Sequence, residues 1–448
     1  MTSGAERNDV DQKGFDSLLA ARRGQEPSWL ISTRERGMKT FTATGFPTTE
    51  HEEWRFTNVE PIRRGGFKLL ESTESPATPE QVENCRFGWS SPIELVFVDG
   101  RFAPDLSQLK KVPRGVSILP LSHTVQAKLE WLRTHYAQYA DEVRDPFVAL
   151  NTAMTTEGAA IFVPRGTVVQ EPIHFLFVST ANSAGTAFHP RNLIVVEESG
   201  QMAVVESYVA TKDAGAYFTN AVTEVVSGSN SVVEHCMIEL DSPAAHNVST
   251  LRAEQHRNSH FTSHSVLVGG SLVRNNVHPV LSGEGCNSIL NGLYVLNGRQ
   301  HMDNFMRVEH AKPHGDSRQF YKGILDDESH GVFSGRIIVH KDAQKTDAKQ
   351  TNRNLLLSDS AQVDTKPQLE IYADDVKCTH GATIGQVNSD AVFYLRSRGI
   401  PEKAARNLLV HAFAGESFAR MKIDGLRDAL ERLVMAKLPR SESPEGSA

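Results

Sequence analysis

Residues 159–385 consist of short apolar runs separated by small polar corners. The runs are rich in Val, Ile, Leu and Phe, as in residues 173–178 and 293–296, and the corners are rich in Gly, Asn and Ser, as in residues 227–230 and 282–285. Such runs are typical of strands, and no segment with the length and period of an amphipathic helix lies between them. This pattern excludes a sheet of alternating strands and helices and leaves a sandwich, a barrel or a solenoid.

The strand-rich region is long for a single sandwich. A parallel solenoid accommodates the length, because each coil stacks on the one before it. We therefore predict a mainly β protein with a parallel β-helix core over residues 159–385. A solenoid needs covered ends, and helical segments on both sides of the core can supply them.

Helical patterns mark both flanks of this core. Phe15, Leu18 and Leu19 form an apolar stripe near the start of the chain, and Ser389 with Asp390 can cap a helix near its end. An Asp-Gly pair at residues 99–100 predicts a tight hairpin turn before the core. The predicted units are an N-terminal helical domain (1–92), a mixed hairpin and helix region (93–158), the β-helix core (159–385), a C-terminal helical domain (386–438) and a disordered tail (439–448).

The composition is that of a soluble globular protein, with 39% hydrophobic and 23% charged residues. The formal net charge is −7 over 448 residues, so no broad basic field points to nucleic acid as a partner. Residues 1–16 are polar and acidic, which predicts no signal peptide, and no apolar run approaches the ~18 residues of a membrane span. We therefore expect a cytoplasmic protein that binds neither nucleic acid nor membrane.

The four cysteines lie far apart in the sequence, at Cys85, Cys236, Cys286 and Cys378. No Cys-x-x-Cys pair occurs, so the thiols form neither a disulfide framework nor a self-contained cluster-binding motif. If this chain holds a metal centre, a partner has to complete the set of ligands.

Cys378 and His380 are the candidate ligands. In an extended strand the side-chain period is two, so the two side chains point to the same face with α carbons roughly 6.6 Å apart. Thiolate and neutral imidazole suit zinc, copper(I) or iron in sulfide clusters. The spacing alone leaves a second interpretation open, in which Cys378 is a small core residue and His380 packs beside it through a hydrogen bond.

Other groupings of chemically active side chains fail on geometry. His256, His260 and His264 are four residues apart, which in a strand spans roughly 13 Å, so we interpret them as surface or turn residues. The adjacent acids at residues 326–327 and 374–375 point to opposite faces of a strand and favour turns. The chain has no Gly-x-x-x-x-Gly-Lys-Ser/Thr loop, so it is not expected to hydrolyse ATP by that route.

Several blocks in the last third of the chain resemble the SufB/SufD family of iron–sulfur cluster assembly proteins. The blocks are QFYKGILDD (319–327), GVFSG (331–335), AQKTDA (343–348), NLLLS (354–358), DTKP (364–367), IYADDVKCTHGAT (371–383) and FYLRSRGI (393–400). The resemblance covers about residues 300–420 strongly. Within the family, the run from Cys378 to Thr383 together with Leu395 is similar to the SufD type. The SufB type usually has an acid before the His, Glu after it and Cys at the Leu395 position.

The resemblance implies a right-handed parallel β-helix between helical domains. It also implies pairing with a SufB subunit along the solenoid and docking of the SufC ATPase on the C-terminal helices, for which Leu408, Leu409 and Phe413 are the predicted contacts. His380 matches the family's interface His, where the nascent iron–sulfur cluster forms, and Cys378 is the second predicted ligand.

By the same resemblance the chain is a non-catalytic scaffold subunit, with ATPase activity in SufC. The cluster is expected to be transient and shared with the partner, with none bound stably by this chain alone. Flavin bound at the level of the complex and a homodimer of the isolated chain are further implications.

Two other functions remain open. One is a β-solenoid carbohydrate-active enzyme that uses acid pairs, although aromatic residues make up only 7% of the chain and show no clustered stripe. The other is a purely structural adaptor that never contacts the cluster.

Overall fold

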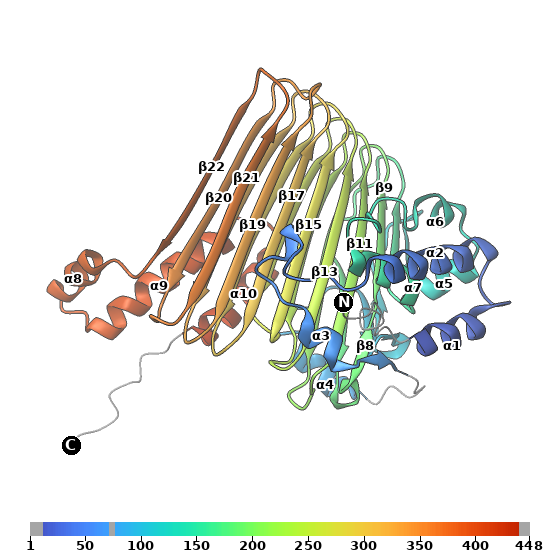
Figure 1. Ribbon diagram of the computed structural model, residues 1–448, viewed down its shortest axis with the longest axis horizontal. Helices are drawn as coiled ribbons and strands as arrows, with labels where there is room; N and C mark the ends of the chain where they lie inside the picture. The colour runs from blue at the N-terminus through green and yellow to red at the C-terminus, as the bar shows by residue number, and fades with distance from the viewer. Residues whose placement is uncertain (1–11, 71–76, 439–448) are drawn as a thin grey trace, which may run out of the picture.

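The computed structural model describes residues 12–70 and 77–438 and shows a parallel β-solenoid with helices toward both ends of the chain (Figure 1). This confirms the predicted mainly β fold class. The predicted disordered tail, 439–448, lies outside the described residues. The predicted domain boundaries stay predictions, although strand β2 (Ile93–Val98) already pairs in parallel with β7 (Ile173–Ser179) and so extends one sheet ahead of residue 159.

The solenoid has two sheets, and each coil contributes one strand to each. Sheet 1 follows the order β21-β19-β17-β15-β13-β11-β9-β6-β5, and sheet 2 the order β22-β20-β18-β16-β14-β12-β10-β7-β2-β3. The strands of sheet 1 are β5 (Ser117–Pro120), β6 (Ala159–Val163), β9 (Arg191–Val196), β11 (Phe218–Ser227), β13 (His246–Gln255), β15 (Leu272–Leu281), β17 (His301–His310), β19 (His330–Val339) and β21 (Gln362–Ile371). The other strands of sheet 2 are β3 (Arg101–Phe102), β10 (Gln201–Ala210), β12 (Val232–Leu240), β14 (His260–Leu267), β16 (Asn287–Leu296), β18 (Asp316–Leu325), β20 (Asp347–Leu356) and β22 (Lys377–Gly385).

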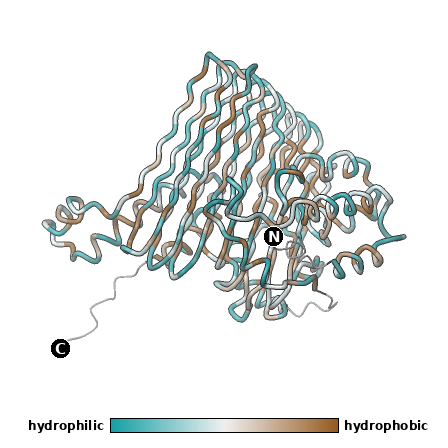
Figure 2. Tube along the Cα trace, in the orientation of Figure 1, coloured by the Kyte–Doolittle hydropathy of each residue, from teal (hydrophilic) through white to brown (hydrophobic). Residues whose placement is uncertain are grey.

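The register places equivalent residues of successive coils in straight rows. Asp316 pairs with Asp347, and Asp347 pairs with Lys377. Because side chains alternate between the two faces of a strand, every second row points into the solenoid and the rows between point outward. Figure 2 shows hydrophobic and hydrophilic residues alternating along the strands. Inside, Phe97, Phe177 and Tyr208 form a stack with ring centroids 4.7 and 4.9 Å apart.

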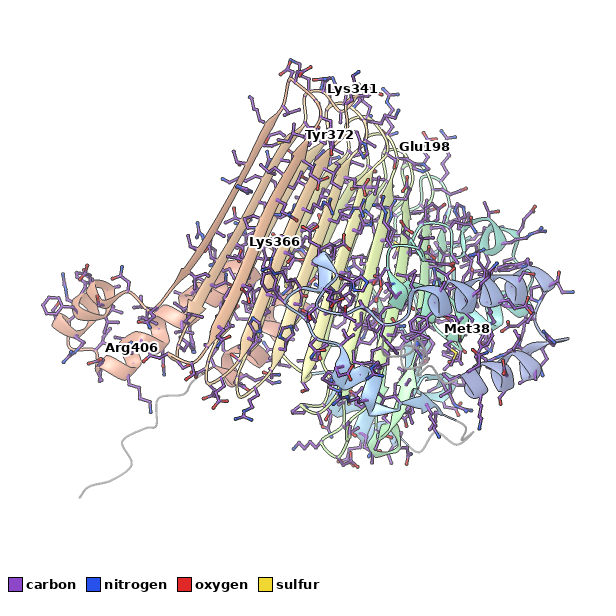
Figure 3. The ribbon with its side chains drawn as sticks, in the orientation of Figure 1. Met38, Glu198, Lys341, Lys366, Tyr372 and Arg406 are labelled. Atoms are coloured by element: carbon purple, nitrogen blue, oxygen red, sulfur yellow. The ribbon has the colours of Figure 1, made fainter. Side chains whose placement is uncertain are left out.

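One ridge of the solenoid is held together by a ladder of turn residues with positive φ. Asn230, Asn258 and His314 have φ of 59°, 55° and 60°. Each donates its backbone N–H to a carbonyl in the turn of the next coil, at 2.8 to 2.9 Å. Figure 3 shows Glu198 and Lys341 along this ridge. His314 is therefore a turn residue in the described structure.

The N-terminal helices cover the outer face of sheet 1. They include α1 (Gln12–Arg22), α2 (Ser28–Thr44) and α7 (Pro146–Met154). Phe147 of α7 lies in one apolar cluster with Phe218 of β11 and Val248 of β13. The predicted stripe near the start of the chain is confirmed for Phe15 and Leu19, which are buried in this cluster.

The C-terminal helices are α8 (Ser389–Ser397), α9 (Glu402–Phe418) and α10 (Asp424–Lys437). Val410 of α9 and Leu430 of α10 pack against the outer face of sheet 2, where Ile238 belongs to the same cluster. The expected cap of α8 at Ser389 and Asp390 is wrong by one position, because Asn388 accepts the first backbone N–H groups. Across 12–70 and 77–438, none of the helices is both long and apolar enough to span a bilayer.

Candidate functional site at the open end of the solenoid

Strands β21 and β22 form the last edge of the two sheets (Figure 1). Within the described residues, neither has a strand on its outer side. Most side chains of β22 are exposed and those of β21 are half-buried, whereas nearly all the strands before them are mainly buried. Ile384 of β22 is 46% exposed although its row points into the solenoid. We call this surface, made by the inward rows of β21 and β22, the open end.

Cys378 and His380 both lie on β22, in the inward-pointing row. Ala348 of β20 pairs with Cys378 and Gln350 pairs with His380. Ala348 and Gln350 are 1% exposed, which shows that this row faces the interior. No described coil follows β22, so the same row leaves His380 exposed instead of sealing it inside. The side chains predicted to share one face therefore do so, at a surface that a second chain can reach.

The thiol of Cys378 is half-buried. Its burial raises its pKa above the ordinary value, and the charge of Asp347 acts in the same direction, while a hydrogen bond with the backbone of Ala348 partly offsets both. The protonated thiol is therefore the stable form near neutral pH in the isolated chain. Iron binding would have to displace this proton, because the thiolate is the ligand.

Two donors do not make a metal site by themselves. In the described parts of the chain, no three His, Cys, Asp or Glu side chains are grouped so that they could hold a metal ion. The other three thiols, of Cys85, Cys236 and Cys286, are buried in the solenoid or beneath its helices, and burial raises the pKa of each. A cluster at His380 therefore needs more ligands than the described residues group there.

The residues predicted for partner docking on α9 differ in exposure. Leu408 is 51% exposed, whereas Leu409 and Phe413 are half-buried. The ring of Phe413 lies 4.2 Å from Lys322 Nζ, which also donates to the Phe413 carbonyl oxygen at 2.9 Å. Figure 3 shows Arg406, two residues before Leu408, on the solvent side of α9.

Helix α8 adds a surface that sequence reasoning missed. Phe393 and Tyr394 are 72% and 58% exposed. Among the described elements, α9 is the main packing partner of α8. The aromatic residues of α8 therefore have no described strand of the solenoid beneath them. Only the tertiary structure shows this, because the local pattern is the same for a buried and an unpartnered helix face.

Most of the histidines and acids interpreted above as surface or turn residues lie at such positions. His256 lies in a turn and His260 is exposed, as expected. The prediction for His264 is wrong, because it is 2% exposed beneath the segment that carries Lys422. Asp375 forms an ion pair with Lys345 in the ridge turns.

Two family models match the chain. The SUF system FeS cluster assembly SufBD core domain matches residues 177–413, and the SufBD protein N-terminal region matches residues 15–175. The chain belongs to the SufBD family of iron–sulfur cluster assembly proteins. Its relatives include an iron–sulfur cluster assembly SufBD family protein of Synechocystis, 33% identical over 96% of this chain and 97% of that protein.

Two relatives carry the SufD name. The iron–sulfur cluster assembly protein SufD of Escherichia coli is 31% identical over 90% of this chain and 92% of its own length. The protein of the same name in Bacillus subtilis is 25% identical over 96% and 98%. The predicted resemblance to the SufD type is confirmed, and the open end is thus a feature of a SufBD protein.

Proposed function

We propose that this chain is the SufD-like half of an iron–sulfur assembly scaffold and that it pairs with a SufB-type chain through the open end. The observation that carries the proposal is the exposure of His380, with Cys378 beside it, on a row that elsewhere in the solenoid is buried. A second chain that continues the solenoid beyond β22 would bury these exposed inward side chains.

The backbone of the open end supports pairing. Strands β21 and β22 are long, and no further strand of the described residues pairs with their outer edges. The backbone N–H and C=O groups of an edge strand are templates for strands of another chain. Pro367 lies in the middle of β21, and proline is tolerated there because an edge strand does not need every N–H for the sheet. The inward side chains of Val363, Leu369 and Ile384 supply apolar surface for the same contact.

Each chain would then contribute half of the assembly site. The imidazole of His380 acts as a neutral ligand or a proton acceptor, and Cys378 becomes a thiolate ligand when iron displaces its proton. The partner supplies the remaining sulfur donors to the nascent cluster, which is the cargo of the scaffold. The chain itself acts as a non-catalytic subunit. Flavin in the complex stays an implication of the family resemblance.

A SufC-type ATPase would dock on the outer surface of α8 and α9. Leu408 of α9, with Phe393 and Tyr394 of α8, forms the exposed apolar surface for this contact. Lys322 of β18 connects α9 to sheet 2 through Phe413 and an ion pair with Glu416. Motion of a docked ATPase would therefore reach the sheet that ends in β22.

Anaerobic co-expression with SufB- and SufC-type partners tests this function. We expect His380→Ala to leave the complex intact and to lower iron and sulfide loading at least tenfold, because even loss of a residue that only orients a ligand typically lowers metal affinity 10–100-fold. The matched control is Thr379→Ala, which lies on the outward row of the same strand. Full loading of the His380→Ala complex would remove the proposed role and would favour the structural adaptor, which predicts that iron and sulfide never associate with this surface.

A further inference from the structure

A short ladder of side-chain amides lies beneath His380 in the interior of the solenoid. Gln319 of β18 pairs with Gln350 of β20, and Gln350 pairs with His380 of β22, so the three occupy one inward row. Gln350 Nε2 donates to Gln319 Oε1 at 2.9 Å. Adjacent strands are about 4.8 Å apart, which places the Gln350 amide within side-chain reach of the imidazole in the next coil.

The oxygen of the Gln350 amide has no hydrogen-bond partner among the described residues. Gln350 is 1% exposed, and its Oε1 accepts no hydrogen bond from any described residue. A buried acceptor without a donor costs about 1–3 kcal/mol. Gln319 Nε2 is likewise without a partner among the described residues, so the two amides satisfy only one donor and one acceptor between them. His380 follows Gln350 in the same row, so its imidazole is the next side chain that can complete Gln350 Oε1.

Gly335 on the opposite sheet leaves the space that the Gln350 amide occupies. A Cβ at residue 335 would lie 1.9 Å from Gln350 Nε2 and 2.7 Å from its Oε1. Gly335 does not have a positive φ, so the backbone conformation does not require glycine. The interior is thus shaped to hold the side chain of Gln350 in one place beneath the open end.

We propose that Gln350 is a positioning residue for His380. When a second chain covers the open end, Gln350 Oε1 accepts the imidazole N–H that faces the interior, and the other ring nitrogen, without its proton, points out of the solenoid toward the cluster. Histidine ligands almost always donate their second N–H to a carbonyl or carboxylate, which fixes the tautomer and the ring orientation. This inference rests on the proposed function, because it assumes that His380 is a ligand.

The test compares Gln350→Leu with Gln350→Glu and with Asn352→Leu in the assembled complex. Leucine removes the acceptor and keeps the size of the side chain, whereas glutamate keeps an acceptor oxygen. Asn352 is the matched control: it is 1% exposed and lies in the same row of β20 two residues on, but it pairs with Ala382. It also bonds Tyr294 and Tyr321, so its loss is at least as damaging to the interior.

The two readouts are iron affinity and the tautomer of His380, followed by long-range ¹H–¹⁵N spectra of histidine-labelled chain and assigned by the signal that His380→Ala removes. We expect Gln350→Leu to lower iron affinity 10–100-fold and to replace a single tautomer by a mixture. Gln350→Glu should restore the single tautomer, and Asn352→Leu should leave it unchanged.

An unchanged tautomer in Gln350→Leu, or an equal disturbance in Asn352→Leu, would overturn the positioning role. The tautomer can be measured without a cluster. If His380→Ala keeps full cluster loading, the proposed function fails, while the spectra still decide whether Gln350 orients the imidazole.

Discussion

The two ends of the solenoid are built from the same kind of coil but differ in what lies beyond them. At the first end, β2 and most of β6 are buried, because β3 pairs antiparallel with β2 and β5 with β6. Phe102 and Val116 then pack against the interior of the first coil. At the other end, β21 and β22 have no such cover in the described structure. Antiparallel additions close a solenoid, whereas a last parallel coil without them leaves the interior open to a partner.

The covered half also buries charge that the open end avoids. Arg191 of β9 donates to Glu224 of β11 at 2.9 Å, and both side chains are fully buried beneath α7 and the segment before it. Glu224 also accepts the backbone N–H groups of Ala137, Tyr139 and Ala140. A buried ion pair of this kind depends on complete enclosure by the protein. Substitutions in the covered half should therefore lower the free energy of unfolding most.

The largest loss of stability is expected for Arg191→Met. Methionine fills much of the volume but leaves the Glu224 carboxylate buried without its cation, which typically costs 3–5 kcal/mol. Urea unfolding of the isolated chain measures this loss. Arg353→Met, at a half-exposed arginine of β20 near the open end, is the control and should change the free energy of unfolding by less than about 1 kcal/mol. Equal losses would remove the contrast between the two ends.

A smaller effect, dependent on pH, is expected at Glu239 of β12. Burial raises the pKa of this carboxyl above 4.5, and the neighbouring Asp241 acts in the same direction. Because the folded chain holds the proton more tightly than the unfolded chain, this group's stabilisation is complete below pH 4.5 and is lost as the pH rises through the folded-state pKa.

Glu239→Gln should remove that loss. The difference in free energy of unfolding between the variant and the parent chain should be larger at about pH 9 than at about pH 5, in favour of the variant. The increase should be at least about 1.4 kcal/mol, which corresponds to one pKa unit. Asp374→Asn, at an exposed acid near the open end, is the control and should show no such gain. Chemical unfolding at both pH values measures this difference. The same difference in free energy of unfolding between variant and parent at both pH values would contradict the expectation.

A loss of about 1–2 kcal/mol is expected for Lys322→Met, at the contact between α9 and sheet 2. The substitution removes a charged donor to the Phe413 carbonyl and to Glu416, but Glu416 is half-exposed and can be hydrated. Hydrogen exchange of α9 compared with α2 measures where the loss falls. Uniform loss of protection across the chain would show that this contact is not a local link.

The smallest effect on folding is expected for Ile384→Asp at the open end. The side chain is already 46% exposed, so the free energy of unfolding should change by less than about 0.5 kcal/mol. Pairing with a SufB-type chain should weaken at least about tenfold, because a carboxylate would be desolvated in the apolar contact. Unchanged pairing in a size-exclusion or calorimetric titration would show that the open end is not the pairing surface.

The sequence by itself determined the features that depend on neighbours along the chain. The short runs and small corners predicted the solenoid, since strand period and turn chemistry are local properties. The two-residue spacing placed Cys378 and His380 on one face for the same reason. The cap of α8 at Asn388 was missed by one residue, because Asn, Ser and Asp are all good caps and the choice depends on where the last strand ends.

Only the tertiary structure decided what surrounds those side chains. Gln350 lies next to His380 because of a register between strands that are far apart in sequence, and His264 is buried because the segment between α9 and α10 lies over it. The exposure of His380 depends on the absence of a further coil in the described chain, which no local pattern records. The strand that carries a side chain decides whether that side chain points into the solenoid or outward. The next coil decides whether the side chain is buried.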